Sequence, residues 1–300
     1  MKTTKKTFIW LLILIITIIW GYAWVLMKAS LQFVGPFTFS ALRFGTGTIT
    51  LLVILVILKI KLPPKQYVKP LVVVGLLQTT IVFLFVMYGL RFVDAGKSSI
   101  ILYTMPIWSS LLAAKFLDEK LTPKKLIGLI VGMVGLVLII GWDFFQAQSI
   151  DTIIGELLIV IAAISWGASN VYYRLRLNHL PKLQVSAYQM FFGTIGIVVA
   201  AMIMEWGQPI NWNGQSIFYI LFTGVLASAL CFTIWFVILS KIDMVSATLS
   251  TLLVPVFGLS FSWLALSEAI TPSILYGSFF IIVGITISQL TGRKRSNANP

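Results

Sequence analysis

The stretch VDAGKSSIILYTMPIWSSLLAAKFLDEKLTPKKLIG, residues Val93–Gly128, returns in outline as IDMVSATLSTLLVPVFGLSFSWLALSEAITPSILYG, residues Ile242–Gly277. Each copy holds an apolar run with a central proline, then a charged corner with a Thr-Pro pair, and then the start of another apolar run. The copies align without a gap at a spacing of 149 residues, which matches Asp94 to Asp243, Pro106 to Pro255, Glu119 to Glu268 and Pro123 to Pro272. A gapless match of this length indicates an internal duplication, and the duplicated unit therefore decides the fold.

The composition is that of a membrane protein. Hydrophobic residues make up 59% of the chain and charged residues only 10%, and the mean hydropathy is +0.99. Apolar runs of about 18 residues or more recur, which is the signal of membrane-spanning helices. The alternation of polar and apolar residues that membrane strands need does not occur. We therefore expect an all-α integral membrane protein.

Ten apolar runs separated by short turns predict ten transmembrane helices. Their expected ranges are 8–27, 37–58, 68–90, 95–117, 125–141, 153–173, 185–204, 217–239, 245–266 and 273–290. The first run follows Lys2, Lys5 and Lys6 as in a signal peptide, but its length and the lack of a cleavage site favour a retained helix.

The net charge of +13 is distributed very unevenly between the two sides of these helices. Eighteen basic residues fall in the loops of one side: Lys2, Lys5, Lys6, Lys59, Lys61, Lys65, Lys69, Lys115, Lys120, Lys124, Lys125, Arg174, Arg176, Lys182, Lys241, Arg293, Lys294 and Arg295. The other side has three, Lys28, Arg91 and Lys97. Loops rich in Lys and Arg stay in the cytoplasm. We therefore expect a multi-pass protein of a bacterial-type cell membrane with both termini in the cytoplasm, and no nucleic-acid partner.

A second register, with a spacing of 146 residues, relates the front of each half. It matches Trp20–Gly21 to Trp166–Gly167 and Gly47–Thr48 to Gly193–Thr194. The change from 146 to 149 needs three extra residues, most simply in the loop around residues 207–214. The chain thus divides into residues 8–141 and residues 153–290, each with five helices. Because five is odd, the second unit enters the membrane from the opposite side, and inverted repeats of this kind are typical of secondary transporters.

Pro106 and Pro255 lie near the middle of the fourth and ninth expected helices. A proline inside a helix removes a backbone hydrogen bond and favours a kink. Prolines in membrane helices often serve packing alone, but the matched positions favour hinges that line a cavity. We expect the two prolines to approach each other near the midplane.

Arg43 is the one ionisable residue that the sequence places well inside a span. It either snorkels to the interface or faces the cavity and attracts an anionic group. Carboxylates, Glu156 among them, are assigned to helix ends or loops. Because proton antiport usually needs a buried carboxylate, the pattern favours facilitated or weakly coupled transport.

Polar and aromatic residues inside the helices are candidates for lining a substrate cavity, although aromatic residues also serve as packing and interface anchors. The candidates are Trp20, Arg43, Gln78, Tyr88, Tyr103, Trp166, Asn170, Gln189 and Ser250. The single Cys231 and the single His179 supply no disulfide framework and no metal site. We expect no catalytic residue, metal or cofactor.

Several short motifs together resemble a known family. They are IIWGYAWVLMK at residues 18–28, ISWGASNVYYR at 164–174, SALRF at 40–44, LDEKLTP at 117–123 and LSEAITP at 266–272. In this order they resemble the ten-helix exporters of the drug/metabolite transporter superfamily, which are built of two EamA-type repeats. The resemblance implies a central cavity, peripheral fifth and tenth helices, and export of small metabolites such as amino acids or toxic analogues. It also implies that Glu119, Pro123, Glu268 and Pro272 form helix junctions.

The prediction is a secondary transporter that moves a small-molecule substrate through the lipid bilayer by alternating access, as a monomer or weak homodimer. A multi-pass membrane enzyme is an alternative, but it would need clustered catalytic side chains near an interface. A channel without alternating access is another, and it would need a continuous polar lining.

Overall fold

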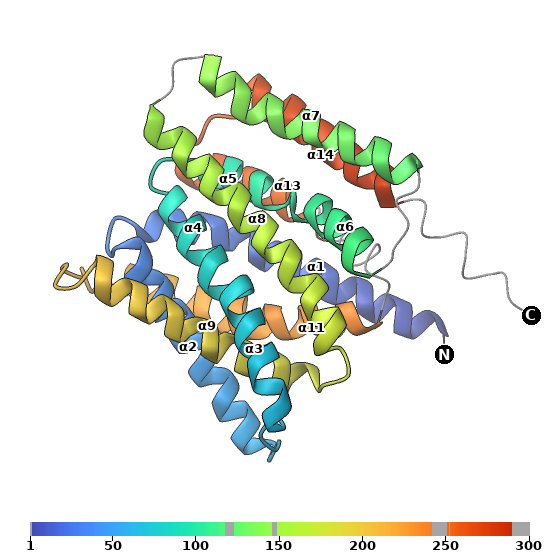
Figure 1. Cartoon of the computed structure of the whole chain (residues 1–300). Helices are drawn as coiled ribbons and strands as arrows, with labels where there is room; N and C mark the ends of the chain where they lie inside the picture. The colour runs from blue at the N-terminus through green and yellow to red at the C-terminus, as the bar shows by residue number, and fades with distance from the viewer. Residues whose placement is uncertain (1, 118–122, 146–148, 242–250, 252, 290–300) are drawn as a thin grey trace, which may run out of the picture.

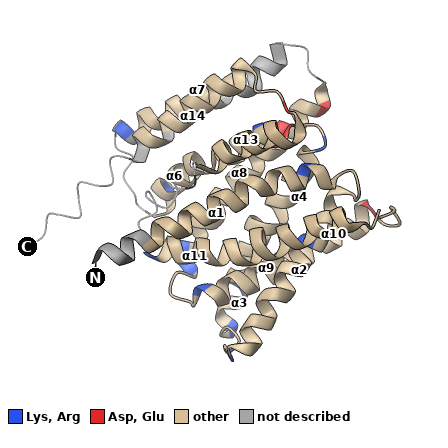
Figure 2. Ribbon diagram, turned by 180° about the vertical axis from the view of Figure 1, so that it is seen from behind, with Lys and Arg blue, Asp and Glu red and all other residues tan. Residues whose placement is uncertain are grey.

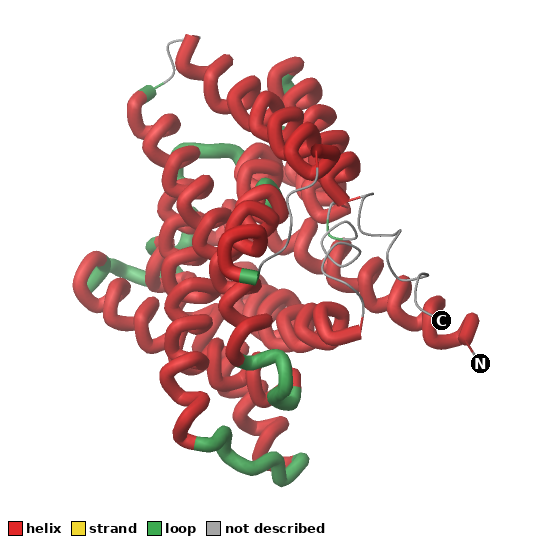
Figure 3. Tube along the Cα trace, turned by 45° about the vertical axis from the view of Figure 1, so that its right-hand side comes forward, coloured by secondary structure: helices red, strands yellow, loops and turns green. Residues whose placement is uncertain are grey.

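The computed structural model describes residues 2–117, 123–145, 149–241, 251 and 253–289, and in that part the regular structure is entirely helical (Figure 3). The first half contains α1 (Lys2–Ser30), α2 (Pro36–Ile57), η1 (Lys65–Tyr67), α3 (Val68–Gly75), η2 (Leu76–Ile81), α4 (Val82–Gly89), α5 (Ala95–Leu102), α6 (Met105–Phe116) and α7 (Pro123–Phe145). The second half contains α8 (Ile150–Arg176), α9 (Lys182–Met204), α10 (Gly214–Leu221), η3 (Phe222–Leu230), α11 (Cys231–Lys241), α13 (Leu253–Leu266) and α14 (Pro272–Gln289).

These elements join into ten rods in the described part. The elements η1 to α4 follow one another without a break, as do α10 to α11, and α5 and α6 form one rod interrupted only at Tyr103–Thr104. Seven of the rods are long and apolar enough to cross a membrane, and three shorter apolar helices accompany them. Large apolar side chains such as Val56 and Ile203 are more than two-thirds exposed on the outside of the bundle. Such surfaces face lipid in an integral membrane protein, and the chain is an all-α membrane protein with two inverted five-helix repeats.

The fifth and tenth rods form a layer of their own at one edge of the bundle (Figure 1). α7 and α14 cross closely because glycines lie at the contact. A Cβ added to Gly135 would lie 2.5 Å from the carbonyl oxygen of Gly277, and one added to Gly284 would lie 2.3 Å from the backbone nitrogen of Gly132. Gly135 and Gly284 are matched positions of the two halves, so the crossing is symmetrical.

Each half also packs its first rod against the fourth rod of the other half. Gly21 of α1 lies against Gly258 of α13, and Gly167 of α8 lies against Ser109 of α6. These two contacts are equivalent in the registers of 146 and 149 residues. Small residues of the duplicated motifs therefore allow the helices of the two halves to approach each other closely.

The pseudo-twofold axis passes between α2 and α9. The hydroxyl groups of Thr48 and Thr194 lie 3.0 Å apart, and these residues are separated by 146 positions. Residues that are equivalent in two repeats can touch each other only where the axis of the repeat passes.

Several of the rods are interrupted in the interior. η2 and η3 are stretches of π-helix in the third and eighth rods. The fourth rod leaves the helix at Tyr103–Thr104, and α6 then begins at Met105, one residue before Pro106. In the same way α13 begins at Leu253, two residues before Pro255. Both prolines are buried. Their approach to each other stays a prediction, and the positions of Glu119 and Ser250 lie outside the described residues.

Candidate functional site

A small pocket lies at the centre of the bundle, where the two halves meet. The first half contributes residues of α1, α2, α4 and the fourth rod, and the second half contributes residues of α8 and α11. The lining residues are Trp20, Ala23, Trp24, Met27, Arg43, Phe83, Leu102, Tyr103, Trp166 and Phe232. Its volume is about 30 Å³, which leaves room for very few water molecules.

Aromatic rings make up most of the wall of this pocket. Trp20 meets Trp166 edge to face, with ring centroids 6.1 Å apart, and Tyr103 meets Trp166 at 5.9 Å. Phe83 and Phe232 lie 6.3 Å apart and are matched in the 149-residue register. Such tilted and edge-to-face pairs are the favoured geometry for aromatic contacts, and they give the pocket apolar walls contributed by both halves.

Arg43 is the one cationic side chain of the pocket lining, and its side chain is only 2% exposed. Its Nε donates to Ser228 Oγ at 2.9 Å, and Nη1 lies 2.9 Å from Met27 Sδ. The guanidinium carbon stands 4.5 Å from the ring centroid of Phe83. Within the described residues, no carboxylate forms an ion pair with it. A buried cation held only by neutral groups is costly unless an anion joins it.

The second half makes the corresponding contact with neutral groups. Gln189 occupies the position of Arg43, and Thr79 occupies that of Ser228. Thr79 Oγ1 donates to Gln189 Oε1 at 2.9 Å. The two contacts are geometrical equivalents, but only the contact in the first half carries a charge.

The matched tryptophans differ as well. Trp20 Nε1 donates to the carbonyl oxygen of Ala227 in the π-helical stretch η3 at 2.9 Å. The equivalent Trp166 Nε1 is buried without a partner in the described structure, and so are both amide atoms of Gln78, the residue matched to Ala227. Buried polar atoms without partners are rare and call for an explanation such as a ligand.

The sequence-predicted candidates divide into separate groups. Trp20, Arg43, Tyr103 and Trp166 line the central pocket. Asn170 is buried, with Nδ2 directed at Met105 Sδ and Oδ1 without a partner in the described structure. Tyr88 lies instead in a cavity near the surface, stacked on Phe37 at 6.0 Å. Pro123 and Pro272 begin α7 and α14.

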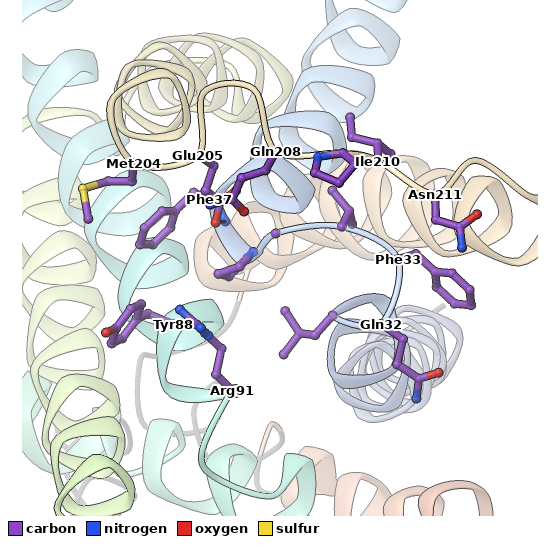
Figure 4. A pocket seen from close by; sticks show the side chains of 15 residues that line it. Gln32, Phe33, Phe37, Tyr88, Arg91, Met204, Glu205, Gln208, Ile210 and Asn211 are labelled. Atoms are coloured by element: carbon purple, nitrogen blue, oxygen red, sulfur yellow. Dashed lines mark hydrogen bonds between the residues drawn. The ribbon is translucent and has the colours of Figure 1, made fainter.

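That surface cavity has a volume of about 710 Å³ (Figure 4). Tyr88 and Arg91 lie on one side of it, and Glu205 and Gln208 lie on the side formed by the segment after α9. A neighbouring cavity of about 490 Å³ contains Lys28, Asp94 and Glu268. Both open at the same end of the bundle.

We call this end the capped face, because Glu205 and Glu268 there accept hydrogen bonds from helix N-termini. The other end, which holds Lys59, Lys61 and Lys241, is called the basic face. In Figure 2 the acidic residues, coloured red on the ribbon, lie towards one side of the bundle, and basic residues, coloured blue, predominate at the other ends of the helices. The structure thus keeps the charge asymmetry that the loops indicate.

Two charged features at the capped face were not predicted from the sequence. The sequence assigned Glu156 to a helix end, but it lies in the second turn of α8, is fully buried and pairs with Lys97 of α5. Glu205 lies beside a loop, directly after α9, as the sequence predicts, but its contact with the first turn of α2 was not predicted. Phe83 and Phe232 are two further pocket residues outside the predicted candidates, and their match at a spacing of 149 residues is the sequence signal that points to them.

Comparisons with known proteins agree with this architecture. The model of the EamA-like transporter family matches residues 7–141 and 153–289. The "Uncharacterized transporter YoaV" of Bacillus subtilis is 34% identical over 94% of this chain and 97% of its own length. A "Probable amino-acid metabolite efflux pump" of Salmonella typhimurium is 26% identical over 96% of both chains, and one of Escherichia coli is 25% identical over 95% of both. A solved crystal structure with 17% identity matches 97% of this chain and 99% of its own with a TM-score of 0.70.

Proposed function

Because the chain belongs to the EamA-like transporter family of membrane transporters, we propose that it exports small carboxylate-bearing metabolites by alternating access. Arg43 carries this proposal: it is a buried guanidinium without a carboxylate partner in the described structure, inside a pocket shared by both halves. Guanidinium groups bind carboxylates through two parallel hydrogen bonds, and such charge-assisted bonds are stronger than neutral ones.

The rest of the lining suits the remainder of such a substrate. Trp20, Tyr103 and Trp166 offer aromatic faces and edges to an apolar or cationic group,. Trp166 Nε1, which has no partner among the described residues, is an additional donor. An amphipathic metabolite of amino-acid size satisfies the charge and the apolar walls together, and the names of two efflux-pump relatives support this substrate class and the export direction.

Alternating access is supported by the size of the pocket and by the repeat. Pockets that bind small molecules usually enclose roughly 300–1,000 Å³, whereas this one encloses about 30 Å³. A substrate can therefore enter only if the helices around the pocket move. Inverted repeats provide two equivalent sets of such movements, and the helix break before Pro106 and the π-helical stretches are local irregularities at which the rods can bend,.

The charge distribution supports an orientation in a bacterial-type cell membrane. The basic face corresponds to the cytoplasm and the capped face to the outside, with both termini in the cytoplasm. The central pocket is formed within one chain, so a monomer is sufficient for transport, and a weak homodimer would not alter the site.

The test is transport by purified protein reconstituted in lipid vesicles, with a panel of radiolabelled amino acids, their keto and amide derivatives, and nucleosides. We expect uptake of carboxylate-bearing compounds, and faster uptake when the vesicles are preloaded with the same unlabelled compound. That stimulation distinguishes a carrier from a channel. Substitution Arg43→Ala should abolish uptake of the carboxylates. Failure of every compound to enter, or full activity of Arg43→Ala, would contradict the proposal.

A further inference from the structure

Two carboxylates at the capped face each bind the start of a helix from the other half of the chain. Glu205 Oε1 and Oε2 accept from the backbone N–H groups of Phe37 and Thr38, at 3.0 and 2.7 Å. Glu268 also uses both carboxylate oxygens: Oε1 accepts from the backbone N–H of Ala95 at 2.8 Å, and Oε2 accepts from that of Gly96 at 3.0 Å. The first N–H groups of a helix have no partner within the helix and carry partial positive charge, so a carboxylate is their best external partner.

The capped helices are the ones that carry the pocket. Arg43 lies on α2, about two turns from its capped start, and Tyr103 directly follows the capped α5. Neither Glu205 nor Glu268 lines the pocket itself. Their caps therefore fix the position of pocket-lining helices of the first half relative to the second half.

Other links between the halves accompany these caps at the capped face. Lys97 of α5 pairs with the buried Glu156 of α8, and the backbone nitrogen of Asn211 donates to the carbonyl oxygen of Phe33 at 2.8 Å. Both halves are thus joined through charges and backbone groups at this end.

The basic face has a different residue at the position that matches Glu205. In the 146-residue register this position is Lys59, an exposed residue that follows α2 with a positive φ of 51°. A lysine has no acceptor for the N–H groups at the start of α9, the equivalent of α2. There the N-cap residue Pro181 makes no side-chain hydrogen bond, and Gln184 Nε2 donates outward to the carbonyl oxygen of Lys61 at 2.6 Å.

We propose that Glu205 and Glu268 are positioning residues that hold the capped face closed. At the basic face the position equivalent to Glu205 is Lys59, which cannot cap the start of α9 as Glu205 caps α2. The inference rests on the alternating access proposed above and adds its directional bias. In the resting transporter the helix movements that open the pocket therefore occur mainly at the basic face, where substrate is collected. Each export cycle breaks both carboxylate caps and re-forms them, which returns the protein to the loading state.

The experiment places a reporter thiol in the pocket. Ala23 lines the pocket and is 2% exposed, so Ala23→Cys in a Cys231→Ala background gives a single cysteine there. Full-length protein in vesicles of each defined orientation is treated with a membrane-impermeant maleimide, and the labelling rate is measured from each face. Three variants follow in this background: Glu205→Gln with Glu268→Gln, Lys59→Glu, and Asp151→Asn. The last removes an exposed carboxylate in the first turn of α8 and is the matched control.

We expect the reporter to label faster from the basic face in the parent protein. The double glutamine variant should label at least about tenfold faster from the capped face, because charge-assisted bonds to two helix starts are weakened. Lys59→Glu, an exposed change that leaves both caps intact, should raise capped-face labelling severalfold by supplying the missing acceptor at the basic face. Asp151→Asn should match the parent.

Two outcomes overturn the inference in distinguishable ways. Labelling from the basic face alone, at parent rates in every variant, removes the role of the glutamates and leaves alternating access standing. Labelling from neither face in any variant removes the accessible pocket, and the proposed function falls with it. If the double variant does not fold, the capped-face labelling rate of Lys59→Glu tests the inference by itself, and a rate equal to that of the parent contradicts it.

Discussion

The contact between Arg43 and Ser228 and the contact between Gln189 and Thr79 occupy equivalent places in the two halves. In each, a side chain from the second helix of one half bonds a hydroxyl group on the third helix of the other half. The first contact carries a buried charge and adjoins the aromatic pocket, whereas the second is neutral. The duplication thus preserved the geometry that holds the halves together, and the chemistry of one copy changed. A fold can therefore be symmetrical while the charge in its central pocket comes from one half alone.

Arg43→Gln would make the two contacts alike. Gln189 shows that a glutamine is accommodated beside a hydroxyl at this place, so the variant should fold and retain its thermal unfolding temperature in detergent. Transport of a carboxylate substrate should fall about 10- to 100-fold, the equivalent of one lost charge-assisted hydrogen bond. Arg43→Lys keeps the charge without the planar fork and should recover part of this loss. Normal transport by Arg43→Gln would place the binding charge elsewhere.

Gly193→Ala and Gly47→Ala test whether the shared geometry is equally tight in both halves. A Cβ on Gly193 would lie 2.4 Å from Thr79 Cβ and 2.6 Å from the carbonyl oxygen of Gly75, while one on Gly47 would lie 2.8 Å from the carbonyl oxygen of Gly224. Both should destabilise the protein by about 1–3 kcal/mol, Gly193→Ala the more. The measurement is unfolding in detergent.

Gly45→Ala is the matched control for this pair. Gly45 lies on the same helix as Gly47, and no atom of the described part of the chain lies within 4 Å of a Cβ at this position. It should leave stability unchanged or slightly raised, since alanine is the better helix former. Equal losses of stability in all three variants would show that the contacts between α2, α9 and the π-helical stretches are not closely packed.

Trp20→Phe and Trp166→Phe compare the two matched tryptophans. Trp20→Phe leaves the carbonyl oxygen of Ala227 without its donor and should cost about 1 kcal/mol of stability,. Trp166→Phe removes an N–H group that has no partner in the described structure, so it should cost less stability and act mainly on substrate affinity. Detergent unfolding and the half-saturating substrate concentration separate the two effects. The reverse order of stability losses would contradict the assigned contacts.

The internal duplication made much of the fold predictable. The matched pairs Trp20 and Trp166, and Thr48 and Thr194, indicated where the halves are equivalent, and the structure places the first pair in one pocket and the second on the axis. The ten helices and the family followed from the same patterns.

The remaining features depend on contacts that leave no periodic signal. Glu205 bonds backbone N–H groups of α2, which every sequence possesses, so its partner could not be read from residue types. Lys97 and Glu156 pair between positions that are not matched in the repeat. Tyr88 follows the π-helical stretch η2, where an additional residue per turn rotates later side chains by about 100°,. A regular helical period therefore cannot assign the side that Tyr88 faces.

The proposed transport depends on Arg43 binding the carboxylate of the substrate. The most direct measurement compares transport of the best carboxylate substrate with that of its neutral primary amide, in the wild type and in Arg43→Gln. The wild type should prefer the carboxylate by about 10- to 100-fold. In Arg43→Gln this preference should fall to within about threefold, because the amide gains nothing from a guanidinium and loses nothing without it. An undiminished preference in the variant would show that Arg43 does not bind the carboxylate.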